Sequence, residues 1–316
     1  SVLSQKELDL TEDAIQEFAV KHVEHSLKDA GRHHGKFLEN SRFSQVLARY
    51  VKGEIDFISL SSETATLLYD QLERAEAIHP IDVIAVEIQS DEEQYTGFLC
   101  FENKVGYTHQ VISGGDGISN EILRHYAILP NPSQKLGSFA FVRLSDQSIV
   151  FADKKRVVDG EETYVLPERV LQCSWQISSR ETVKLVNKIA TKVAEEHGAN
   201  STVAVSRAKS YIAENAETSE LLSPMDMGQE IFAQSQVMQS EFRHQIREAG
   251  LDAAVPVDRS YAQKAGKNHR IRTDTGIEIS IPVDYFDNEQ YVEFINNPNG
   301  TLSIALKNIA KITNRQ

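Results

Sequence analysis

The fold of this chain is decided by the stretch Ile81-Asp-Val-Ile-Ala-Val-Glu-Ile88 and by the run Tyr95-Thr-Gly-Phe-Leu-Cys-Phe101 that follows it. Both runs are rich in β-branched and aromatic residues, which is typical of strands. Similar runs follow at Val105–Val111, Ser138–Leu144 and Ile149–Ala152. We therefore predict an antiparallel β-meander, with tight turns at Glu102-Asn-Lys104 and Asp146-Gln147 and a loop at Ser113–Gly117.

Helical patterns precede the meander. Thr11 is a good N-cap for a helix whose apolar residues repeat at helical spacing until Gly31. A second helix carries Leu68 and ends before Pro80, because proline cannot continue a helix. Between the two helices, we interpret Arg32–Lys36 as a loop with positive character.

Helical patterns also follow the meander. Ser178-Ser-Arg-Glu181 has the spacing of a capping box, and Asn200 can cap the next helix. Ser223-Pro224 predicts the start of a third helix, which we expect to continue through Glu230–Ala249 and to end at Gly250.

The C-terminal segment returns to β structure. A turn at Asp274-Thr-Gly276 joins Ile271 to Ile277–Ile281, and a second hairpin joins Tyr291–Ile295 to Leu302–Leu306. We predict an α+β protein with N-terminal helices and an antiparallel β-meander, a helical middle region and a C-terminal β-hairpin unit. The predicted boundaries are 1–177, 178–252 and 253–316.

The composition is typical of a globular protein. The 316 residues are enough for about two domains. No stretch approaches the ~20 apolar residues of a membrane-spanning helix, so we expect a cytoplasmic protein that makes no membrane contact. Cys100 and Cys173 lie in apolar, strand-like surroundings, which predicts buried, reduced thiols. Because the numbering starts at Ser1, we expect residues before it to be missing.

Charge is distributed unevenly along the chain. The net charge is −13 at pH 7, whereas a protein that coats DNA is normally basic. From Arg259 to Thr273, however, no acidic residue occurs. The predicted nucleic-acid-binding residues lie in this segment, on a loop and strand edge: Arg259, Lys264, Lys267, His269, Arg270 and Arg272. Such a cluster can hold phosphates on an acidic protein; an ordinary solvated basic loop is the alternative.

Three segments near the C-terminus match the pattern of a known family. They are Glu241-Phe-Arg-His-Gln-Ile-Arg-Glu-Ala-Gly-Leu251, Val255-Pro-Val-Asp-Arg259 and His269-Arg-Ile-Arg-Thr-Asp-Thr-Gly-Ile-Glu-Ile279. Through them the chain resembles the bacterial nucleoid-associated protein family often called NdpA, and the similar arrangement upstream extends the resemblance over nearly the whole chain. Members of that family are described as cytoplasmic proteins that co-locate with the chromosome, without an established enzymatic reaction. The resemblance implies a chromosomal setting but assigns no DNA-contacting residues.

These observations predict a non-enzymatic protein, without cofactor or metal, that associates with the bacterial nucleoid. We expect it to bind double-stranded DNA either through the basic segment or through a nucleoid or DNA-processing protein already bound there. The acidic remainder makes a pure protein-protein adaptor an alternative, because such a surface engages basic partners. A homodimer is expected, since symmetric dimers are common.

Other charged clusters have competing interpretations. Asp82, Glu102 and Lys104 could form a Mg²⁺-dependent nuclease site, although Glu102 and Lys104 fall where a turn is favoured. Lys154-Lys-Arg156 is a second candidate DNA surface, but nearby acidic residues favour a neutralised surface turn. His22 and His25 have a spacing that could share a metal, and we favour a half-buried, hydrogen-bonded His22.

Overall fold

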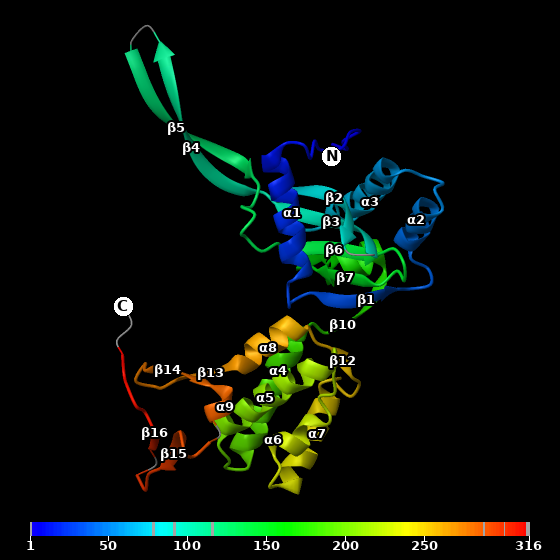
Figure 1. Cartoon of the computed structure of the whole chain (residues 1–316). Coiled ribbons are helices and arrows are strands. Elements are labelled where there is room, and N and C mark those ends of the chain that lie inside the picture. Colours follow the sequence, from blue (N-terminus) through cyan, green and yellow to red (C-terminus); the bar gives the residue numbers. More distant parts are fainter. Residues whose placement is uncertain are drawn as a thin grey trace. The chain divides into compact units, whose positions relative to one another are not determined.

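The chain forms two compact units, which we call unit 1 (Ser1–Gln176) and unit 2 (Ile177–Gln316) (Figure 1). The computed structural model describes residues 2–77, 80–90, 93–114, 117–286, 288–299 and 301–313. Both units combine helices with antiparallel strand pairs, which confirms the predicted α+β class. The separation of a helical region from a β-rich C-terminal unit at residue 252 stays a prediction.

An antiparallel sheet forms the centre of unit 1. Its described strands follow the order β10-β1-β7-β6-β3-β2 across the sheet. Their bounds are β1 (His33–Phe37), β2 (Ile81–Ser90), β3 (Glu93–Glu102), β6 (Ser138–Arg143), β7 (Ile149–Ala152) and β10 (Cys173–Gln176). The sequence predicted β2, β3, β6 and β7, and these are confirmed. The predicted loop at Arg32–Lys36 is wrong, because most of it is the strand β1, which pairs with β7 on one side and β10 on the other.

Helices bury both faces of this sheet. One face packs against α1 (Asp13–Leu27), and the other packs against α2 (Arg42–Val51) and α3 (Phe57–Leu72). Along β3, Phe98 faces the α2–α3 side and Leu99 faces α1, since successive strand side chains point to opposite faces. A strand buried on both sides is apolar along its length, which is why these runs were visible in the sequence.

A long hairpin separates β3 from β6 in sequence. β4 (Lys104–Gly114) and β5 (Gly117–Ile128) pair with each other and, among the described strands, with no other (Figure 1). Val105–Val111 is therefore a strand, as predicted, but its place in the meander is wrong, because β6 pairs with β3 instead. The sequence did not predict β5. Most of the predicted loop at Ser113–Gly117 is strand, and its centre, Gly115 and Asp116, lies outside the described residues.

Two histidines of α1 form hydrogen bonds with the segment that follows β5. His22 Nε2 lies 3.4 Å from the carbonyl oxygen of Pro130, and His25 Nδ1 lies 2.9 Å from that of Pro132. His22 is hydrogen-bonded, as predicted, but it is buried and not half-buried. The two cysteines of unit 1, Cys100 and Cys173, are buried and free, which confirms the predicted thiols. The unit also contains β8 (Lys155–Val158), β9 (Glu161–Tyr164) and the π-helix η1 (Val165–Leu171).

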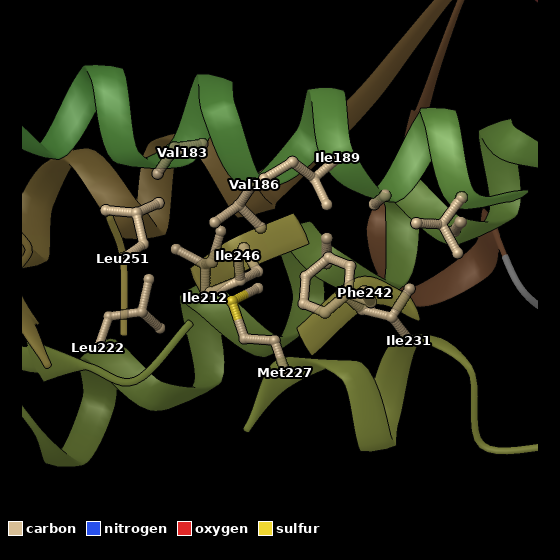
Figure 2. Packing of buried hydrophobic residues seen from close by; sticks show 14 of the residues in the cluster. Val183, Val186, Ile189, Ile212, Leu222, Met227, Ile231, Phe242, Ile246 and Leu251 are labelled. Carbon is tan, nitrogen blue, oxygen red and sulfur yellow. The ribbon is translucent and has the colours of Figure 1, made fainter. Parts of the chain in front are cut away.

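Unit 2 begins with packed helices. Their bounds are α4 (Ser179–Glu196), α5 (Ser201–Thr218), α6 (Met227–Ile231), α7 (Gln236–Glu248) and α8 (Arg259–Lys267). Figure 2 shows Val186 of α4 pointing toward Ile246 of α7, with Met227 of α6 closing the same core. The capping box of Ser178 and Glu181 opens α4 as predicted.

The long helix that we predicted after Ser223-Pro224 is wrong in two respects. No helix starts there, and α6 and α7 are separate. The chain breaks at Phe232, whose buried ring packs edge-on against Phe242 at 6.0 Å between centroids. Ser235 then caps α7 by accepting a hydrogen bond from the Met238 amide. Burial of Phe232 thus takes precedence over helix continuity.

Both predicted C-terminal hairpins are confirmed. They are formed by β13 (Asn268–Arg272) with β14 (Glu278–Pro282) and by β15 (Val292–Asn296) with β16 (Leu302–Leu306). The short helix α9 (Val283–Phe286) joins them, and Ile281, Phe286 and Val292 form a small core between them. The pair β11 (Leu221–Leu222) and β12 (Val255–Pro256) holds the segment before α8. The basic segment thus lies between the helical core and the first hairpin.

Candidate nucleic-acid interface

Helix α8 carries the first part of the basic segment. Asp258 caps it by accepting a hydrogen bond from the Tyr261 amide at 2.9 Å. Ala262 and Gly266 are buried against α5, whereas Lys264 and Lys267 are exposed. Lys264 and Lys267 are three residues apart, so they lie on the same side of the helix. The predicted loop position of these lysines is wrong, and a rigid helix holds them instead.

Gly266 allows α8 to lie very close to α5. A Cβ atom at this position would be 2.3 Å from the Cβ of Ala213 and 2.8 Å from the backbone oxygen of Lys209, both on α5. Either distance is shorter than an ordinary van der Waals contact. A glycine is therefore required here. The close contact that it allows sets the distance of Lys264 and Lys267 from α5.

Strand β13 carries the second part of the segment. Its residues alternate, with His269 and Ile271 turned inward and Arg270 and Arg272 exposed. Ser280 lies opposite Arg270 on β14, and Glu278 lies opposite Arg272. The Arg272 guanidinium forms an ion pair of 4.0 Å with Glu278, and such an exposed pair contributes little. In the described part of the chain, no carboxylate forms an ion pair with Lys264, Lys267 or Arg270.

His269 does not belong to the exposed surface, contrary to our prediction. Its side chain is 4% exposed, and its ring lies 4.4 Å from the ring of Phe286. Burial, together with the nearby charge of Lys209, lowers the pKa of His269 to about 4. Its Nδ1 has no hydrogen-bond partner among the described residues. The ring is consequently neutral at pH 7 and adds no positive charge.

Arg259 has a structural role in addition to its charge. Its guanidinium donates a hydrogen bond of 3.2 Å to the carbonyl oxygen of Glu217, in the last turn of α5. A cation at the C-terminus of a helix interacts favourably with the helix dipole. Arg259 therefore joins α8 to α5, and it lies at the opposite end of α8 from Lys267.

The structure adds cations that sequence reasoning missed. Lys209 of α5 is half-buried, and burial lowers its pKa. No sequence signal indicates it, because its nearness to His269 arises only from tertiary packing. Lys184, Lys188 and Lys192 are exposed and follow one another at a spacing of four on α4. Helical spacing could have indicated this row; Lys192 pairs with Glu196 at 3.8 Å.

The second candidate DNA surface is neutralised by ion pairs. Lys154 Nζ lies 2.6 Å and Arg156 lies 3.0 Å from the carboxylate of Glu102, and Lys155 lies 2.7 Å from that of Glu162. This confirms the predicted neutralisation, although Lys155 and Arg156 lie on β8 and not on a turn. The cluster therefore offers little free positive charge.

The residues of the nuclease alternative do not converge. Asp82 lies opposite Phe101 in the β2–β3 ladder and Glu102 lies opposite Ile81, so the two carboxylates point to opposite faces of the sheet. Glu102 is held by its ion pairs with Lys154 and Arg156, and Lys104 Nζ donates to Gln134 Oε1 at 3.1 Å. Among the described residues, no group of three or more His, Cys, Asp or Glu side chains is placed to hold a metal ion.

Comparison with known proteins identifies the family. The family model NA37, described as nucleoid-associated protein YejK, matches residues 1–313. No curated protein is significantly similar to the chain. In the part of the chain that the structure describes, no helix is both long and apolar enough to cross a membrane.

Proposed function

This chain belongs to the nucleoid-associated protein family, and on that premise we propose that it binds the phosphate backbone of double-stranded DNA through unit 2. The proposed contact is the α8–β13 surface, which we define as its four exposed cations: Lys264, Lys267, Arg270 and Arg272. Arg259 and His269 are left out, because one joins α8 to α5 and the other is buried.

The observation that supports this proposal most is the division of the α8 and β13 side chains between a buried and an exposed side. The small and apolar residues of the segment face inward, and the cations face outward. The segment contains no carboxylate, in a chain whose net charge is −13. A local positive surface on an acidic protein attracts a polyanion from one side only. The rest of the molecule would be repelled, so binding is oriented.

The proposed contacts position the protein without reading the DNA sequence. Lys and Arg side chains on an exposed surface contact phosphate oxygens, which are the same at every base pair. The segment also exposes two amide side chains, Gln263 of α8 and Asn268 of β13, but the proposed contacts are those of the four cations with phosphate, and none is to a base edge. We therefore expect binding to duplexes of any sequence with similar affinity.

The proposed role is non-enzymatic and needs no cofactor. The separation of Asp82 from Glu102 across the sheet removes the best nuclease candidate. Because the proposed partner is chromosomal DNA, we propose that the protein is found in the cytoplasm, at the nucleoid. Incubation with plasmid DNA and Mg²⁺ should leave the DNA intact; cutting that the substitution Glu102→Gln abolishes would contradict this assignment.

The net charge of −13 favours a second candidate, an adaptor that reaches the nucleoid through a DNA-bound protein. The two candidates differ in their affinity for bare DNA. An adaptor should show little binding to a purified duplex at physiological salt and should co-purify with a chromosomal protein. Direct binding of the purified chain to a duplex would contradict the adaptor.

The test compares two variants with the same change in charge. The first neutralises the α8–β13 surface with Lys264→Gln, Lys267→Gln, Arg270→Gln and Arg272→Gln. The control neutralises four cations of unit 1 that are already held in ion pairs: Lys21, Lys28, Arg74 and Lys155. Fluorescence anisotropy with a short duplex should show a large loss of affinity in the first variant only. Equal losses in both variants would mean that net charge, and not this surface, determines binding.

A further inference from the structure

Helix α4 has a row of lysines on the side that faces away from the helical core of unit 2. Lys184, Lys188 and Lys192 are exposed and follow one another every four residues, which places them on one side of the helix. Figure 2 shows Val186 and Ile189 of the same helix pointing into the core. We call these three cations the lysine row. Packing of the apolar side fixes the orientation of α4, so the row is held toward solvent.

The lysine row lies in a segment without carboxylates, as the α8–β13 surface does. Residues 182–194 contain no Asp or Glu. In the described chain, no carboxylate forms an ion pair with Lys184 or Lys188. Lys192 pairs with Glu196 at 3.8 Å, but an exposed pair of this kind contributes little, and another anion can replace it. The row is therefore available to an anion from outside the chain.

The two units of the chain differ in charge. Unit 1 contains 17 Lys and Arg against 28 Asp and Glu, whereas unit 2 contains 16 against 18. Most of the net charge of −13 thus belongs to unit 1. Seven of the 16 cations of unit 2 lie in the lysine row and the α8–β13 surface. A polyanion is therefore repelled least by unit 2, and its contacts with phosphate are favoured there.

Helices α4 and α8 begin side by side. The backbone amide of Asp258, which caps α8, donates a hydrogen bond of 2.9 Å to Oγ of Ser179, the first residue of α4. Arg259, at the start of α8, bonds to the last turn of α5, whereas Gly266, near its end, lies against the middle of α5. Helix α8 is thus antiparallel to α5, and so is α4, which the short connection 197–200 joins to α5. The two helices therefore run in the same direction along α5.

The dimensions of these elements fit one DNA duplex. The lysine row spans eight residues of helix, which is about 12 Å at about 1.5 Å per residue. A duplex carries a phosphate about every 1.7 Å of its axis, so about seven phosphates lie along that length. Two helices that flank a third lie about 20 Å apart at most, which is the length of about six base pairs. One short duplex can thus reach both the row and the α8–β13 surface.

We propose that the lysine row is a second contact with the phosphate backbone of double-stranded DNA, bound by the same duplex as the α8–β13 surface. This inference rests on the proposed function and extends the DNA-binding surface of unit 2 onto α4. Lysine presents a point charge with three donors, which suits phosphate oxygens. The row therefore adds affinity and salt dependence without any preference for a sequence.

The first test measures how the affinity for a short duplex depends on salt. The lysine-row variant carries Lys184→Gln, Lys188→Gln and Lys192→Gln. The slope of the logarithm of the association constant against the logarithm of the salt concentration should become less steep by about 2.7, since each phosphate contact contributes about −0.9.

The control variant removes the same charge from unit 1. It carries Lys36→Gln, Arg42→Gln and Lys52→Gln, at exposed positions that form no ion pair in the described part of the chain. Its slope should equal that of the unmodified chain. Equal changes of slope in the lysine-row variant and the control would overturn the inference, because net charge would then determine binding.

A second test needs no substitution. The full chain is acetylated with acetic anhydride, with and without saturating duplex, and the rate at each lysine is read by mass spectrometry. The duplex should slow acetylation of Lys184 and Lys188 but not of Lys36 and Lys52. Acetylation of the lysine row at the same rate with and without duplex would overturn the inference.

Failure of this inference differs from failure of the proposed function. An unchanged slope in the lysine-row variant, together with a reduced slope in variants of the α8–β13 surface, would overturn the second contact alone. Absence of salt-dependent binding by the unmodified chain would overturn both.

Discussion

Protonation of His269 should destabilise unit 2 in mild acid. The ring is 4% exposed, packs against Phe286 and lies near the charge of Lys209. The pKa of His269 is lowered to about 4 in the folded chain, against 6.5 for an ordinary histidine. Between these values the unfolded chain binds a proton that the folded chain does not bind. The stability that this neutral ring contributes is therefore complete above about pH 6.5 and is lost as the pH falls toward about 4.

The size of the effect follows from the two pKa values. Their difference of about 2.5 corresponds to about 3 kcal/mol, at about 1.4 kcal/mol per pH unit. Most of this, about 2 kcal/mol, is lost between about pH 7 and about pH 5. A loss of this size is large compared with the stability of a typical domain. Acid should therefore loosen the contact of β13 with α9 and α5.

The assay follows the histidine rings by NMR. The signal of His269 is identified as the one missing from the variant His269→Phe, and its chemical shift is titrated with pH. It should change near pH 4 and stay constant between about 6 and 8. The free energy of unfolding is measured in urea titrations followed by the helical circular dichroism signal. As the pH falls, it should decrease more steeply in the unmodified chain than in the variant. A ring that titrates near 6.5 would refute the burial of His269 and its neutral state at pH 7.

Three substitutions test the packing and capping inside the units, one in unit 1 and two in unit 2. Ser178→Ala removes the capping box shared with Glu181 and should lower the free energy of unfolding by about 1 kcal/mol in urea titrations. Gly97→Val places a Cβ 2.2 Å from the Phe141 ring in the sheet of unit 1, and overpacking of this kind should cost about 1–3 kcal/mol in thermal melts. Gly266→Leu should push α8 away from α5 and weaken DNA binding, in anisotropy titrations, without any change in charge.

The sequence predicted elements whose signal is local. The runs that became β3 and β6 are apolar throughout because helices cover both faces of the sheet. The start of α4 was visible because Ser178 and Glu181 satisfy each other's backbone within one turn. Hairpins with Asn, Asp and Gly turns were visible for a similar reason.

Elements that depend on distant partners could not be predicted in the same way. The strand His33–Phe37 contains polar residues and a glycine, which indicated a loop. Its Gly35 is required because a Cβ there would be 2.7 Å from the backbone oxygen of Ser174 on β10, which is far away in the sequence. Gly266 likewise permits a close contact between helices that the sequence does not indicate.

For the candidate site, the sequence indicated the basic residues but not which of their side chains are exposed and which are buried. The acid-free segment selected six residues, of which Lys264, Lys267, Arg270 and Arg272 form the proposed surface, whereas Arg259 and His269 do not. The burial of His269 depends on Phe286 and Lys209, which pack against it from α9 and α5. No local pattern predicts those contacts, and only the fold separates the exposed cations from the buried ring.

The most direct test of the DNA contact is the salt dependence of binding. The logarithm of the association constant for a short duplex is plotted against the logarithm of the salt concentration. Four phosphate contacts predict a slope of about −3.6, since each contributes about −0.9. The double variant Lys264→Gln with Lys267→Gln should reduce the steepness by about 1.8. An unchanged slope in that variant would contradict the account, because the contacts would then lie elsewhere on the chain.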